Sequence, residues 1–177
     1  ATGAGVVQPD LSIAMSDTPF PIPAEGTVDY QYFVVDPKLA EDRWVNTAEL
    51  IPGDRSVVHH GIVFIRPPDG QRIDGVGWLT AYVPGQRIPH SPNYRARRLP
   101  AGSKLVFQMH YTPNGKPTTD ISRLNLWFSS ADEVTEELST LISINQELEI
   151  PPQLASVPIK AQTDNLPEDG QLLALSP

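Results

Sequence analysis

The sequence predicts an all-β fold, a jelly-roll-like sandwich of two antiparallel sheets, on three observations. Glycine and proline together account for 12 + 19 = 31 of 177 residues, about 18% against a usual ~12%, which suits short strands joined by turns. Apolar and polar residues alternate in several short segments, as expected for half-buried strands. These segments recur roughly every 8–12 residues, a spacing typical of β-sandwiches.

The first strands can be placed from this alternation. Residues 1–27 are rich in proline and glycine and are expected to form an extended lead-in along a sheet edge. Val28, Tyr30 and Val34 alternate with polar residues in the first expected strand of the sandwich. Further strands are expected over residues 43–51, 56–65, 77–83, 104–111 and 121–128. Residues 84–103 are expected to be an irregular connection rich in proline and arginine.

The C-terminal third has weaker signals. Residues 132–138 (DEVTEEL) are expected to form one or two turns of helix, and residues 138–150 and 156–161 two more strands. The sandwich domain is therefore predicted to span residues 28–165.

Composition excludes several classes of function. The net charge of −8 and a pI near 4.8 argue against a surface that follows nucleic-acid phosphates. The absence of cysteine excludes disulfides, thiolate metal sites and a cysteine nucleophile. No apolar run approaches the ~20 residues that a membrane span requires. The four histidines are thus the only candidate nitrogen ligands for a metal ion: His59, His60, His90 and His110.

Three of these histidines lie in expected strands. His59 and His60 are adjacent, so both rings can reach one ion only if the strand is irregular there, and Gly61 is a candidate for that irregularity. His110 shares a strand face with Gln108. Three imidazoles from two strands suit copper or zinc. The alternative is that one ring of the pair lies in the core and the other in solvent.

Three segments carry a resemblance to a known family: VVHHGIVF (57–64), LPAG (99–102) and FQMHY (107–111). Together they resemble the N-terminal domain of the copper type II, ascorbate-dependent monooxygenases, the family of peptidylglycine α-hydroxylating monooxygenase and dopamine β-monooxygenase with bacterial relatives. The resemblance covers roughly residues 20–128. It implies that His59, His60 and His110 hold one electron-transfer copper ion per chain. Gln108 and Tyr111 are candidates to support these ligands, and simple packing is the alternative for Tyr111.

The same resemblance implies the partners and the reaction of the chain. In the family a second domain binds the catalytic copper, so we expect such a domain after Pro177 or on another chain, with residues 166–177 as a linker and its beginning. The family reaction is C–H hydroxylation with O₂ and an external reductant, ascorbate-like or a cytochrome, and this chain alone is expected to be inactive. A periplasmic or extracellular location is expected.

Other interpretations remain open from the sequence. The chain could be a non-catalytic β-sandwich subunit or interaction module with a residual three-histidine site for copper or zinc. His90 is expected to be a solvated loop residue, with a fourth ligand as the alternative. Arg95, Arg97 and Arg98 are expected in a solvated loop, with docking of an acidic partner or of a substrate carboxylate as the alternative.

Overall fold

The structure is a computed structural model, and it describes residues 8–73, 75–86, 90–163, 166 and 169–175. It divides into two compact units, one ending at Thr140 and the other beginning at Leu141. All regular secondary structure of the described residues is β-strand. No helix long and apolar enough to cross a membrane occurs among them.

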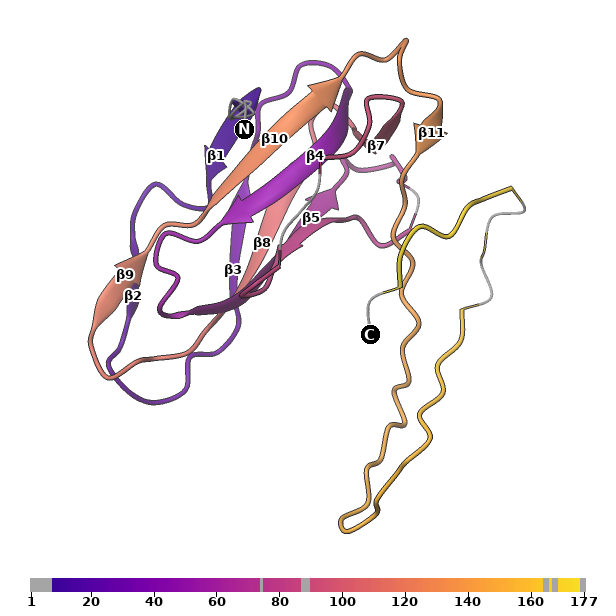
Figure 1. Cartoon of the computed structure of the whole chain (residues 1–177). Coiled ribbons are helices and arrows are strands. Elements are labelled where there is room, and N and C mark those ends of the chain that lie inside the picture. The colour runs from indigo at the N-terminus through magenta and orange to yellow at the C-terminus, as the bar shows by residue number, and fades with distance from the viewer. Residues whose placement is uncertain (1–7, 74, 87–89, 164–165, 167–168, 176–177) are drawn as a thin grey trace, which may run out of the picture. The chain divides into compact units, whose positions relative to one another are not determined.

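The first sheet of the larger unit has five strands in the order β1-β10-β4-β7-β11 (Figure 1). Their bounds are β1 Leu11–Ala14, β10 Arg123–Ser129, β4 Arg43–Ile51, β7 Arg95–Leu99 and β11 Glu136–Glu137. Neighbours are antiparallel except that β11 runs parallel to β7.

The second sheet has four antiparallel strands in the order β3-β8-β5-β6. Their bounds are β3 Gln31–Val35, β8 Lys104–Tyr111, β5 Val58–Arg66 and β6 Trp78–Tyr82. A two-stranded ribbon, β2 Phe20–Ile22 with β9 Thr118–Asp120, completes the fold. The predicted all-β sandwich of antiparallel sheets is confirmed.

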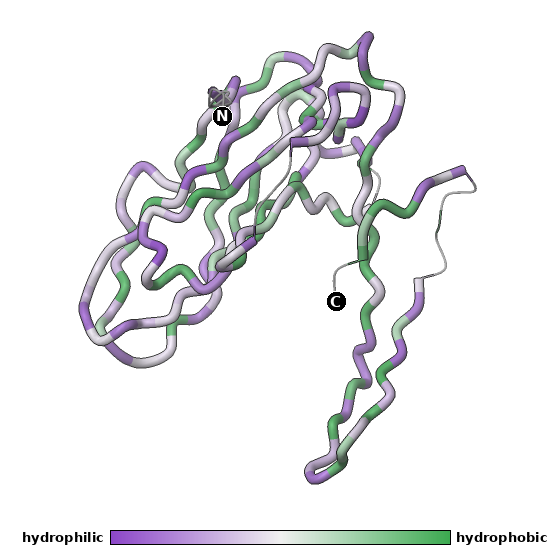
Figure 2. Tube along the Cα trace, viewed as in Figure 1, coloured by the Kyte–Doolittle hydropathy of each residue, from purple (hydrophilic) through white to green (hydrophobic). Residues whose placement is uncertain are grey.

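The core lies between the two sheets and follows the alternation of the strands. In β8, Leu105, Phe107 and Met109 are fully buried, whereas the residues between them are half-buried on the outer face. Leu124 and Leu126 of β10 are fully buried in the same core cluster. Hydrophobic residues are frequent along β5 and β8 (Figure 2). Each Å² of apolar surface buried in this core contributes on the order of 25 cal/mol. This burial stabilises the pairing of β5 with β8, and the pairing in turn fixes which side chains lie on the outer face of the sheet.

The expected N-terminal lead-in contains β1 and β2, joined by bends, and β1 pairs with β10 at the edge of the five-stranded sheet. The limits 1–27 of the lead-in stay a prediction. Residues 1–7 lie outside the described part of the chain.

Two other expectations are wrong. The connection over residues 84–103 contains β7, because Ala96 and Leu99 are buried while the arginine side chains around them find partners. Residues 132–138 form no helix, since so short a segment cannot offset the cost of nucleation. Instead, backbone N–H groups of residues 135, 136 and 138 donate to carbonyls of Tyr94 and Ala96.

The smaller unit lacks the strands expected over residues 138–150 and 156–161. Apolar and polar residues alternate along it (Figure 2), yet apolar side chains such as Ile144 and Ile150 are about two-thirds exposed. A strand needs a hydrogen-bonded neighbour, and alternation alone does not supply one. The domain limits 28–165 and 166–177 stay predictions.

Candidate metal centre

The His59–His60 pair lies at a β-bulge in β5. Val58 pairs with Tyr111 and His60 pairs with His110, so one residue of β5, His59, has no partner in β8. A bulge puts consecutive residues on one face of a sheet, and both histidines accordingly lie on the outer face, His59 exposed and His60 half-buried. The predicted irregularity is confirmed, but its extra residue is His59 and not Gly61.

Gly61 has a different role, which is close packing. A Cβ atom at this position would lie 2.7 Å from Leu50 Cδ2 and 2.8 Å from Met109 Sδ. Leu50 belongs to β4 in the opposite sheet. Glycine therefore lets β5 approach the core closely immediately after the two histidines.

His110 completes a cluster of three imidazoles. It lies on the outer face of β8, directly paired with His60. The ring centroids of the three histidines are 4.9 to 5.2 Å apart. One ligand atom from each lies within 4.8 Å of those of the other two. The three histidines singled out in the sequence thus lie close enough together to bind a metal ion.

The nitrogen atoms of the adjacent pair are spaced for binding to one ion. His59 Nδ1 and His60 Nδ1 are 3.0 Å apart, and two nitrogens that bind one ion at about 2.0 Å and roughly a right angle lie about 3 Å apart. His110 Nδ1 is buried without a hydrogen-bond partner, a costly arrangement that a cation would relieve. The donor set is neutral nitrogen only, which suits copper or zinc.

The protonation of His60 favours ligation. Burial lowers the pKa of His60, and repulsion from His110 and His59 lowers this pKa further. The folded protein therefore favours the neutral ring, the form whose lone pair can bind a metal ion.

Tyr30 is a residue of this centre that the sequence reasoning missed. Its hydroxyl is 3.3 Å from His60 Nε2, the ring nitrogen on the side away from His59 Nδ1. Its ring stacks on His110 with centroids 4.8 Å apart and planes 17° apart. The alternation of residues 28–34 puts Tyr30 on a sheet face, but only the β3–β8 register, in which Gln31 pairs with Met109, puts it beside His110.

The two candidate supports of the ligands, Gln108 and Tyr111, make their hydrogen bonds to residues outside the cluster. Gln108 is on the outer face near His110, but its amide donates to the Tyr32 hydroxyl at 2.8 Å. Tyr111 lies on the opposite face, buried in the core, where its hydroxyl donates to Asp120 Oδ2 at 3.0 Å. The structure gives neither side chain a hydrogen bond to a cluster histidine, and Tyr111 faces away from the cluster.

His90 lies away from the cluster. It is exposed, and its ring packs edge-on against Trp127 of β10 with centroids 4.9 Å apart. It is absent from the group of residues whose ligand atoms converge. The structure therefore does not bring His90 to the metal centre as a fourth ligand.

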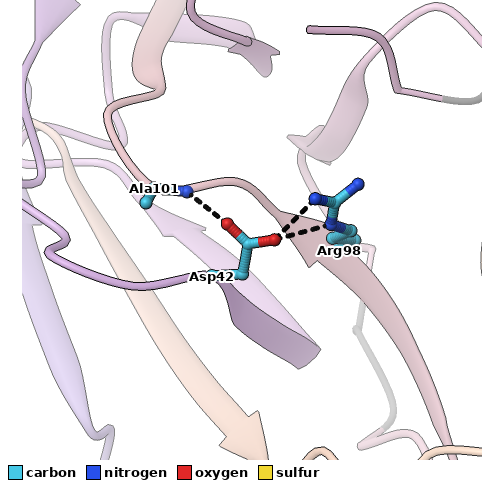
Figure 3. A network of polar contacts seen from close by, with 3 residues as sticks. All are labelled: Asp42, Arg98 and Ala101. Atoms are coloured by element: carbon cyan, nitrogen blue, oxygen red, sulfur yellow. Dashed lines mark hydrogen bonds and ion pairs between the residues drawn. The ribbon is translucent and has the colours of Figure 1, made fainter.

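The three arginines do not form a solvated loop. They belong to β7, where Arg95 pairs with Glu136 and Arg98 with Asp42, each at 2.6 Å. Asp42 also accepts a hydrogen bond from the Ala101 N–H at 2.8 Å (Figure 3). This backbone hydrogen bond, followed by that from Arg98, lowers the pKa of Asp42. The prediction of a solvated basic loop is wrong, because internal partners occupy these side chains.

Comparisons with known proteins found no similar protein. No family model matches the chain. No curated protein and no solved structure matches it either. The candidate site therefore stands on its own geometry.

Proposed function

We propose that this chain is the copper-binding electron-transfer domain of a protein similar to the type II copper monooxygenases, with one copper ion per chain. The observation that carries the proposal is the convergence of His59, His60 and His110 on the outer face of one sheet through a bulge in β5. A bulge that turns two adjacent histidines to one side has no evident value for packing, since both rings lie outside the core.

The residues of the centre would have different roles in holding a metal ion. His59 and His60 offer their Nδ1 atoms 3.0 Å apart, and His110 offers a buried Nδ1 without a partner. The Tyr30 hydroxyl orients the His60 ring by contact with its other nitrogen. Copper, when bound, would supply one-electron transfer. His59 is exposed, which leaves one side of the centre open to an electron donor.

The remaining residues favour electron delivery over catalysis of hydroxylation by this chain. Met15 and Met109 are buried in the core, and His90 packs on Trp127. In the described part of the chain, His59, His60 and His110 are the one group of histidine and carboxylate side chains that converges as metal ligands could. C–H hydroxylation would then need a second copper domain, after Pro177 or on another chain, and an external reductant such as ascorbate or a cytochrome. Copper chemistry of this kind suits a periplasmic or extracellular location.

A second candidate function is a zinc-bearing interaction module. The all-nitrogen donor set also suits Zn²⁺. Beside it, Tyr32 and Val34 are more than half exposed on the same sheet, where they could contact a partner. Metal preference and redox activity distinguish the two candidates.

The test is metal loading of the purified chain. We expect one equivalent of Cu(II) with nitrogen couplings in electron paramagnetic resonance, reduction by ascorbate, and reoxidation by oxygen. The triple variant His59→Ala/His60→Ala/His110→Ala should lose this signal, and His90→Ala is the matched control that should retain it. The same signal in the triple variant would refute the site. A bound Cu(II) ion that ascorbate does not reduce, together with tighter binding of Zn²⁺, would favour the interaction module.

A further inference from the structure

A second possible binding site lies inside the sandwich, apart from the histidines. A pocket of about 140 Å³ opens between β4 and β7 of one sheet and β6 of the other. The pocket is lined by the apolar side chains of Val45 and Leu79 and by the polar residues Asn46, Ser91 and Arg97. A volume of this order holds a molecule of roughly six non-hydrogen atoms, or several waters.

Arg97 brings a positive charge into this pocket. It pairs with Val45, a buried residue of β4, so its side chain points to the inner side of the sheet. Burial lowers the pKa of Arg97 to about 10, and the guanidinium therefore stays protonated at neutral pH. Its hydrogen-bond partner among the described residues is the neutral Thr140 hydroxyl, at 2.9 Å.

The neighbouring arginines show what Arg97 lacks. Arg95 and Arg98 each have a carboxylate partner at 2.6 Å. Among the described residues, no carboxylate lies within ion-pair distance of Arg97, although Glu137 attracts it from farther away. Arg97 is half-buried, and a guanidinium that is partly withdrawn from water without an anion is costly; a bound carboxylate would relieve this cost with two parallel hydrogen bonds.

Asn46 supplies the complementary group. In the β4–β10 pairing, Val45 and Thr47 have partners and Asn46 is the extra residue of a bulge. Its Nδ2 donates to Asn93 Oδ1 at 3.2 Å, whereas its own Oδ1 is buried without a partner. The pocket therefore combines an unpaired cation with an unpaired hydrogen-bond acceptor.

We propose that this pocket binds a small carboxylate that also carries a hydrogen-bond donor, of the class of 2-hydroxy acids and of glycolate or lactate size. The carboxylate pairs with Arg97, and the hydroxyl donates to Asn46 Oδ1. The carbon atoms lie against Val45 and Leu79. The site is independent of the metal centre, which lies on the outer face of the other sheet.

The ligand experiment uses the full chain, labelled with ¹⁵N and freed of metal by a chelator. Lactate is titrated in, and the amide signals of Thr47, Thr80 and Ser91 are followed by NMR. We expect saturable shifts at these residues and none at His59 and His60. Acetate, which lacks the donor, and lactamide, which lacks the charge, should each bind about tenfold more weakly, the loss expected for one hydrogen bond or more.

Variants separate this site from general binding of anions. Arg97→Gln should abolish the lactate shifts, and Arg98→Gln, on the same strand but paired with Asp42, is the matched control that should retain them. Asn46→Asp keeps the shape of the side chain and should also abolish binding, because its charge repels the carboxylate and competes for Arg97. This variant tests the proposal if Arg97→Gln fails to fold.

Two outcomes would overturn the proposal. If lactate at its highest soluble concentration shifts none of the pocket amides, the pocket holds solvent only. If the shifts persist in the folded Asn46→Asp variant, or occur at the histidines, lactate binds elsewhere.

Discussion

The histidines of β5 and β8 and the arginines of β7 are two groups of polar side chains that the sequence singles out, and the fold uses them differently. His59, His60 and His110 converge on one another on an outer face, and His110 Nδ1 is left without a partner. Arg95 and Arg98 diverge, each toward a carboxylate of a different segment. The charge of these two arginines is used to attach neighbouring segments to the sheet.

This difference between the histidines and the arginines shows which structural properties make a group of polar residues a candidate binding site. The arginines are close together in the sequence of one strand, whereas His110 lies on a different strand from His59 and His60. What distinguishes the histidines is convergence from two strands together with an unsatisfied buried nitrogen. Arg97 differs from both groups: it is half-buried, it donates to the neutral Thr140 hydroxyl, and it lacks the carboxylate that its two neighbours have.

The largest expected effect is the loss of a ligand from the histidine cluster. His110→Ala should weaken copper binding at least about a hundredfold, since it removes one of three ligands and opens the buried side of the site. Isothermal titration with a competing chelator measures the change. Arg95→Gln, a change in the other cluster, should leave copper affinity unaltered. An unchanged affinity in His110→Ala would place the copper outside this cluster.

The second effect is stabilisation by the metal ion. A sandwich of this size should fold without metal, because its core is contiguous. Copper at about a thousandfold over its dissociation constant should then raise the free energy of unfolding by about 4 kcal/mol. Thermal unfolding followed by circular dichroism, with and without copper, measures this. An unfolded metal-free chain would contradict the prediction and indicate a structural metal.

The third effect is smaller and tests how Tyr30 supports the cluster. Tyr30→Phe removes the hydroxyl near His60 Nε2 but keeps the ring stacked on His110. We expect about tenfold weaker copper binding, the lower range for partners of metal ligands. Tyr32→Phe is the matched control, since the Tyr32 hydroxyl contacts Gln108 instead. Equal affinities in the two variants would show that the hydroxyl of Tyr30 does not orient His60.

The smallest effect concerns the arginine cluster. Asp42→Asn should lower the free energy of unfolding at pH 7 by about 0.5–1 kcal/mol, because an exposed ion pair is screened by solvent. The pKa of Asp42 is lowered in the folded protein, so its contribution is present above its ordinary pKa of 3.8 and is lost as the pH falls below it. The free energies of unfolding of wild type and variant, measured with urea, should therefore differ at pH 7 and become equal in acid. A constant difference across this range would contradict the role of the charge.

Much of the fold could be predicted because strand alternation is a local property. The strand expected over residues 104–111 has the bounds of β8, and the outer face of His110 follows from its parity with Gln108. Residues 141–163 show the limit of such reasoning, since their apolar residues alternate without a neighbouring strand to pair with. The strand β7 was missed because arginine-rich segments give no apolar alternation, although the long arginine stems can be buried.

The candidate site divides in the same way. The types and order of its ligands can be read along the chain: two adjacent histidines in one strand and a third in another, with the choice between copper and zinc left open. Two features depend on the pairing of strands that are distant in sequence: the bulge residue is His59, and Tyr30 lies over His110. The physical reason is register. A shift of one residue between β5 and β8 would turn a side chain to the other face of the sheet, and only the packing of the whole sandwich selects one register.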